Sequence, residues 1–198
     1  MSGRVWLIVD LAAKILLVGL LLFAVLRPDL PQFAGKAMAG RAMTYPVAAI
    51  VVPAAWWLFA RRRAFPFDVD ILVVSPFLID TAGNALNLYD TVEWWDDANH
   101  LVNWALLTAA FVLALRPFRL AALNAALLGI GFGATSAIIW EVLEYFTFIR
   151  DSPELKTAYA DTLGDLGLGL SGSVIAATLV VLAGHYLRRA RSPSIPER

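Results

Sequence analysis

Residues 5–26 read VWLIVDLAAKILLVGLLLFAVL, an apolar run in which Asp10 and Lys14 are the only charged residues. A helix needs about 20 predominantly apolar residues to cross the hydrocarbon core of a bilayer. This stretch therefore predicts a transmembrane helix. Its length and its internal charges differ from a cleaved signal peptide, whose apolar region is short, so we expect the helix to be retained.

The rest of the chain repeats this pattern. Of 198 residues, 60% are hydrophobic and 16% are charged, whereas soluble domains carry about a quarter charged residues. Further apolar runs predict helices over residues 42–60, 69–88, 98–115, 120–149 and 162–187. The sequence thus predicts an all-α fold, a polytopic membrane helix bundle of about six transmembrane helices. We expect residues 1–198 to form a single integral membrane domain.

Basic residues are distributed unequally between the two sides of the predicted bundle. One side collects ten arginines, and the other collects five basic residues. The positive-inside rule places the richer side, with both chain termini, in the cytoplasm. The ten arginines are Arg4, Arg61, Arg62, Arg63, Arg116, Arg119, Arg188, Arg189, Arg191 and Arg198.

The composition also excludes several classes of function. There is no cysteine, which excludes disulfides, thiolate metal ligands and a cysteine nucleophile. The formal net charge is zero, and no basic stretch is long enough to indicate nucleic acid binding. The expected partner is the lipid bilayer, and the sequence leaves the oligomeric state open.

Acidic and amide residues gather at the predicted extracytoplasmic ends of four helices. Side chains three or four residues apart share one face of a helix, and a bundle can bring such faces together, as in the di-metal carboxylate proteins. The groups are Asp80 with Asn84 and Asn87; Asp96 and Asp97 with His100; Glu141 with Glu144; and Asp161 with Asp165.

Such a cluster predicts a divalent metal site. Carboxylates brought close together repel one another, so protons or a cation must neutralise them, and a histidine among them favours zinc, manganese or iron(II). A metal there could act on a lipid or lipid-linked substrate. Under this hypothesis the ligands are Asp97, His100, Glu141, Glu144 and Asp165. Asp80 and Asp161 are then supporting groups or general bases.

Three of the four groups also have a simpler interpretation. Asp161 can cap the last helix, residues 94–97 can form an interfacial loop, and Glu141 with Glu144 can be a solvated helix end. Taken as a set, the acids can be the polar network of a structural or assembly subunit, or the path of a proton- or ion-coupled transporter. The sequence leaves these alternatives and an enzyme open.

The acidic motifs resemble those of a known family. Trp140-Glu141-x-x-Glu144 stands ahead of Asp161-Thr162-x-x-Asp165-Leu166, while Asp80-x-x-x-Asn84 and Asp97-x-x-His100 lie upstream. These motifs, between Asp80 and Ala177, resemble the YjdF-type small bacterial integral membrane proteins. The resemblance implies a multi-helix protein of the bacterial plasma membrane with acidic motifs in its second half. It implies no particular activity, because the family is uncharacterised.

Overall fold

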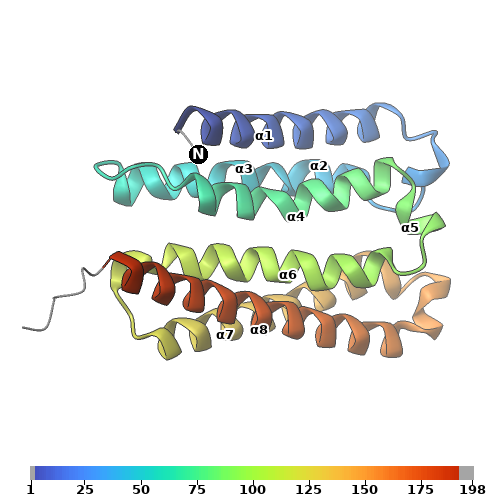
Figure 1. The fold of residues 1–198 in the computed structure, drawn as a ribbon. Helices are drawn as coiled ribbons and strands as arrows, with labels where there is room; N and C mark the ends of the chain where they lie inside the picture. Colours follow the sequence, from blue (N-terminus) through green and yellow to red (C-terminus); the bar gives the residue numbers. More distant parts are fainter. Residues whose placement is uncertain (1–2, 192–198) are drawn as a thin grey trace, which may run out of the picture.

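The computed structural model describes residues 3–191, which form a bundle of roughly aligned helices (Figure 1). Arg198, counted above on the cytoplasmic side, lies outside these residues. The elements are α1 (Gly3–Leu26), η1 (Pro31–Phe33), α2 (Met38–Thr44), α3 (Pro46–Ala55), η2 (Trp56–Ala60), α4 (Phe67–Ala85), α5 (Leu88–Thr91), α6 (Trp95–Ala114), η3 (Arg116–Phe118), α7 (Ala122–Glu144), η4 (Tyr145–Ile149), η5 (Pro153–Lys156) and α8 (Ala158–Arg191).

The helices form two layers that meet at α4 and α6 (Figure 1). One layer contains α1 to α4, and the other contains α6 to α8. We call the end with the start of α1, the end of α8 and the connections 61–66 and 116–121 the terminal end. The opposite end, the α5 end, holds α5 and the connections 27–37 and 145–157. The acidic groups predicted above belong to helix ends at the α5 end.

The distribution of side chains is that of a membrane protein. On α1, Ile8 and Ile15 are 65% and 71% exposed, whereas Asp10 is 3% exposed. Apolar side chains on the outside and carboxylates on the inside suit a lipid solvent. In the described part of the chain, five helical segments are long and apolar enough to cross a bilayer: Gly3–Leu26, Met38–Ala60, Trp95–Phe118, Ala122–Thr147 and Ala158–His185.

The predicted helical membrane bundle is thus confirmed, with α4 packed among these five segments as the sixth long element. Helix ends differ from the predicted ones for local reasons. The predicted run 42–60 divides at Pro46, which has no amide hydrogen to donate and begins α3. The predicted run 69–88 ends at Ala85, because Asn87 adopts a left-handed conformation with a φ of 59°. α8 begins at Ala158, four residues earlier than predicted.

Candidate metal centre

His100 stands at the centre of the site, in the second turn of α6. Two neighbouring helices come close to α6 here because each presents a glycine. A Cβ on Gly83 of α4 would lie 2.9 Å from a ring carbon of Trp95, and a Cβ on Gly172 of α8 would overlap the carbonyl oxygen of Leu101. The close approach of α8 brings Asp165 to the imidazole, and the close approach of α4 brings Asp80 to a neighbouring cavity.

Three carboxylates from three helices surround the imidazole of His100. The Nδ1 atom lies 3.6 Å from Oε1 of Glu141 on α7, and the Nε2 atom lies 3.6 Å from Oδ1 of Asp165 on α8. One turn earlier on α6, Oδ1 of Asp96 lies 3.9 Å from Nε2. All three distances exceed those of a hydrogen bond. Each ring nitrogen of the imidazole therefore faces at least one carboxylate oxygen, at a distance longer than a hydrogen bond.

The innermost part of this cluster is buried and unsatisfied. His100, Glu141 and Asp165 are 7%, 5% and 3% exposed. His100 Nδ1 and Glu141 Oε1 are both buried and have no hydrogen-bond partner among the described residues. A buried polar atom without a partner costs about 1–3 kcal/mol. These two atoms face each other, and a cation or a water between them could satisfy both.

The spacing between these atoms fits a metal ion. Two ligand atoms at about 2.1 Å from one ion, at a tetrahedral angle, lie about 3.4 Å apart. The ligand atoms form two groups, each within 4.8 Å: His100 with Glu141 and Glu144, and His100 with Asp96 and Asp165. The groups use opposite sides of one imidazole, so a single ion can take one of them. The buried cluster could hold a metal.

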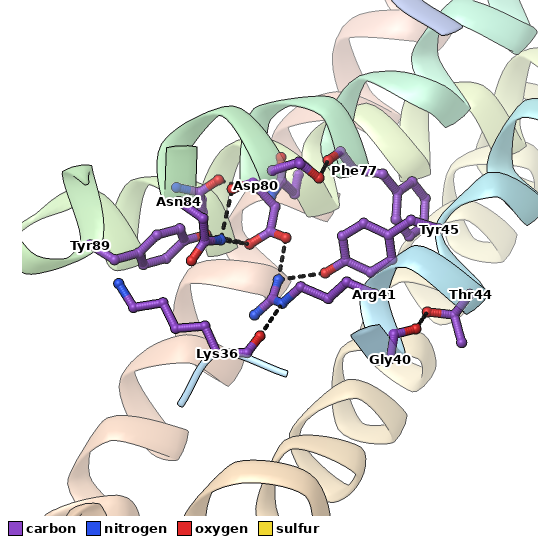
Figure 2. Close-up of polar contacts among 12 residues, drawn as sticks. Lys36, Gly40, Arg41, Thr44, Tyr45, Phe77, Asp80, Asn84 and Tyr89 are labelled. Carbon is purple, nitrogen blue, oxygen red and sulfur yellow. Dashed lines mark hydrogen bonds and ion pairs between the residues drawn. The ribbon is translucent and has the colours of Figure 1, made fainter. Parts of the chain in front are cut away.

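A second network lies beside this cluster and pairs both carboxylate oxygens of Asp80 (Figure 2). Arg41 Nη1, from α2, forms an ion pair with Asp80 Oδ2 of α4 and also donates to the hydroxyl of Tyr45 at 2.6 Å. Asp80 Oδ1 accepts a hydrogen bond from the hydroxyl of Tyr89 at 2.7 Å, and Asn84 Nδ2 lies 3.4 Å from the same oxygen. Asp80 is thus held as an acceptor by three neighbours.

Tyr89, on α5 outside the spans, stays neutral in this network. Burial, together with the negative charge of Asp80, raises the pKa of the Tyr89 hydroxyl far above its usual value. The hydroxyl therefore remains a donor to Asp80 at any physiological pH. Lys36 lies 5.6 Å over the ring of Tyr89 and forms an ion pair with Asp90 at 2.8 Å. These contacts connect α5 to the segment that precedes α2.

A cavity of about 160 Å³ lies between the two networks. It is bounded by α2, α4 and α5 on one side and by α6 and α7 on the other. Its polar wall includes Arg41, His100 and Glu144, while Trp104 and Trp140 contribute apolar surface. A cavity with both polar and aromatic walls can receive a small polar group attached to an apolar body.

The predicted site residues are distributed unequally around this cavity. His100, Glu141, Glu144 and Asp165 are brought together, as the metal hypothesis expects. Asp80 lines the same cavity but is paired with Arg41. Asp97 and Asp161 are exposed and belong to neither ligand group found among the described residues; the acid beside His100 is Asp96, with a half-exposed side chain.

Sequence reasoning missed the basic and aromatic half of the cavity. Arg41, Tyr45 and Tyr89 were not singled out. Arg41 and Asp80 are 39 residues apart, so no helical spacing connects them. One signal for this pairing is present in the sequence. Arg41 directly precedes the apolar run 42–60, on the side of the predicted bundle where the acids gather. An arginine at the end of a membrane helix, on a side with surplus acids, favours an ion pair with one of them.

One protein family matches most of the chain. Residues 9–185 match the family described as predicted membrane protein, DUF2238. The chain belongs to the DUF2238 family. YjdF-type proteins are members of DUF2238, so the resemblance drawn from the acidic motifs is confirmed. No curated protein and no solved structure matches this DUF2238 protein.

Proposed function

We propose that this DUF2238 protein binds one divalent metal ion through His100 Nδ1, Glu141 and Glu144. The observation that carries the proposal is the pair of buried, unpartnered atoms, His100 Nδ1 and Glu141 Oε1, 3.6 Å apart. Glu144 completes the set and also lines the cavity. Three protein ligands with a further position open to a cavity are typical of catalytic zinc sites.

Asp165 has a supporting role in this arrangement. A metal-bound histidine usually donates its other ring N–H to a carboxylate, which fixes the tautomer and orients the ring. Asp165 Oδ1 lies 3.6 Å from Nε2 of His100 and is 3% exposed. We assign it as the acceptor of that proton. Asp97 then takes no part in the ligand set, and Asp161, exposed at the start of α8, is the candidate general base.

The charges around the site also favour a cation. Asp96, Glu141, Glu144 and Asp165 bring four carboxylates to one imidazole. Arg41, which faces the same cavity, is already engaged by Asp80. Carboxylates crowded together must be neutralised by protons or by a cation. A divalent ion of zinc, manganese or iron(II) neutralises two of the four negative charges and accepts the nitrogen ligand. Protons can neutralise the remaining carboxylates.

The substrate that fits this setting is a lipid or lipid-linked molecule, which the protein hydrolyses or otherwise modifies. The cavity lies within the bundle towards the α5 end, with a polar wall for a head group and aromatic side chains for the adjoining apolar part. A bound divalent ion activates water or polarises an ester or phosphoryl oxygen. We place the protein in the bacterial plasma membrane as one integral domain, with this end extracytoplasmic.

The test is the metal content of the purified protein. After reloading with zinc, manganese or iron(II) and removal of free ions, we expect about one ion per chain in the wild type. His100→Ala and Glu141→Ala should lose it while their helical content is retained. Glu93→Gln removes an exposed acid near the same end and should keep it. A wild type that binds no ion after reloading, or a His100→Ala variant that binds as well as the wild type, would contradict the proposal.

A further inference from the structure

A second buried charged cluster lies in the half of the bundle towards the terminal end, away from His100. Lys14 Nζ on α1 forms an ion pair with Asp10 Oδ2 one turn earlier at 3.0 Å. The same nitrogen forms an ion pair with Asp70 Oδ2 on α4 at 2.5 Å. One ammonium thus bridges two carboxylates from two helices. We call these three residues the α1–α4 triad.

The triad is enclosed, and part of it is unsatisfied. Asp10 is 3% exposed and Asp70 is 0% exposed, while the side chain of Lys14 is 16% exposed. The second oxygens of the two acids, Asp10 Oδ1 and Asp70 Oδ1, are buried and have no hydrogen-bond partner among the described residues. A carboxylate that is buried and ionised needs acceptor sites filled on both oxygens. The Oδ1 atom of each acid therefore lacks a donor, although Lys14 donates to both Oδ2 atoms.

The charges do not balance within the triad. Two carboxylates face one ammonium. Among the described residues, Lys14 and Asp10 are the charged groups that act most strongly on Asp70. The nearby acid on α4, Asp68, is paired with Arg116 of η3 at 2.5 Å. Arg4 on α1 and the arginines 61–63 after η2 are exposed. A net negative charge enclosed by membrane helices is expensive, so a further positive charge belongs here.

We propose that Asp10 and Asp70 share one exchangeable proton, which makes the α1–α4 triad a proton-binding site. The ammonium of Lys14 already occupies the position between the acids where a metal ion would have to lie. A proton needs no such space, and it supplies the missing donor on one of the unpartnered oxygens. The triad then holds one neutral carboxylic acid, one carboxylate and one ammonium, with no net charge.

Infrared difference spectroscopy of the protein in lipid tests this inference. At neutral pH, the wild type should show the carbonyl band of one protonated carboxylic acid, and this band should shift in deuterated water. The band should be absent from the spectra of Asp10→Asn and of Asp70→Asn. Either substitution leaves one carboxylate against one ammonium, so the remaining acid gives up its proton. Acids near His100 contribute equally to every spectrum and cancel in the difference.

Asp68→Asn is the matched control, because it removes an acid from the same turn of α4 that has its own arginine. Asp68→Asn should keep the band, so the band should cancel in the difference between the wild-type spectrum and the Asp68→Asn spectrum. Lys14→Met should add a second protonated acid. The thermal transition of the wild type should fall as the pH rises and the shared proton is lost, and Asp10→Asn should not follow this dependence. A band that persists in Asp10→Asn or in Asp70→Asn would overturn the proposal, and so would a wild type that shows no such band.

Discussion

At the scale of single residues, a substitution of Asp80 tests whether this carboxylate stabilises the fold or binds the metal. Asp80→Ala leaves the guanidinium of Arg41, a side chain only 13% exposed, without its carboxylate. Breaking a buried pair from one side costs about 3–5 kcal/mol. We expect the free energy of unfolding, measured in mixed micelles, to fall by about that amount. The metal content should be retained, because Asp80 belongs to neither ligand group.

The exposed pair of Arg27 and Asp29 provides the control. The two side chains are 51% and 62% exposed and joined at 2.8 Å. Exposed pairs contribute little to stability, so Asp29→Ala should leave the unfolding free energy unchanged. If Asp80→Ala left the unfolding free energy as unchanged as Asp29→Ala, the pair of Arg41 and Asp80 would contribute no more than an exposed ion pair. Loss of metal from Asp80→Ala would instead assign Asp80 to the site.

Sequence spacing predicted part of the site and missed the rest for a physical reason. Glu141 with Glu144 could be placed on one helix face, because three residues make nearly one turn. Asp96, Asp97 and His100 lie on the same helix, and local spacing allows either acid to approach the imidazole. The choice depends on the side-chain rotamers that packing against α7 and α8 imposes. The pairing of Arg41 with Asp80 depends on how α2 packs on α4. Local periodicity carries no information about either.

At the scale of helices, the approach of α8 to α6 determines whether Asp165 reaches His100. A Cβ at Gly172 would overlap the Leu101 carbonyl oxygen and would lie 3.2 Å from the Ala105 nitrogen. Backbone atoms cannot yield as a side chain end can, so Gly172→Ala should push the two helices apart. We expect weaker metal binding, measured by competition with a chelator, and a lower thermal transition.

Gly167 is the matched control on the same helix. A Cβ there meets nothing within 4 Å, and alanine favours a helix over glycine by about 1 kcal/mol. Gly167→Ala should therefore bind metal as the wild type does. If Gly172→Ala also bound metal normally, the close approach of α6 and α8 would not determine the geometry of the site.

The helices themselves were largely predictable, because lipid imposes long apolar runs that are visible in the sequence. Their interruptions were harder to place. Pro46 and Pro53 both lie in the second run, yet α3 begins at Pro46 and contains Pro53. A proline is compatible with a first turn or with a membrane helix interior. The choice between these depends on the packing of the neighbouring helices.

At the scale of the whole molecule, orientation in the membrane can be measured directly, because the chain has no cysteine. Arg62 and Asp151 are exposed and lie at opposite ends of the bundle. In intact cells, a membrane-impermeant maleimide should label Asp151→Cys and should label Arg62→Cys only after permeabilisation. The converse pattern would place the cavity on the cytoplasmic side.

The two buried charged clusters are separated by apolar packing. Leu17, Leu21 and Val74 are at most 2% exposed and pack with Tyr45 between the levels of Asp70 and Asp80 on α4. A coupled transporter would need a polar route along this length. The packing instead favours two independent sites, a metal site near the α5 end and a proton site between α1 and α4.

The acids of α4 have a consequence for how the protein is made. An ionised aspartate at the centre of a span costs about 3 kcal/mol on leaving the translocation channel for lipid, and α4 carries Asp68, Asp70 and Asp80. Lys14, synthesised 56 residues before Asp70, neutralises it only once α1 lies alongside. We expect α1 to wait beside the channel until α4 emerges, so that the first layer enters the bilayer as one unit during translation.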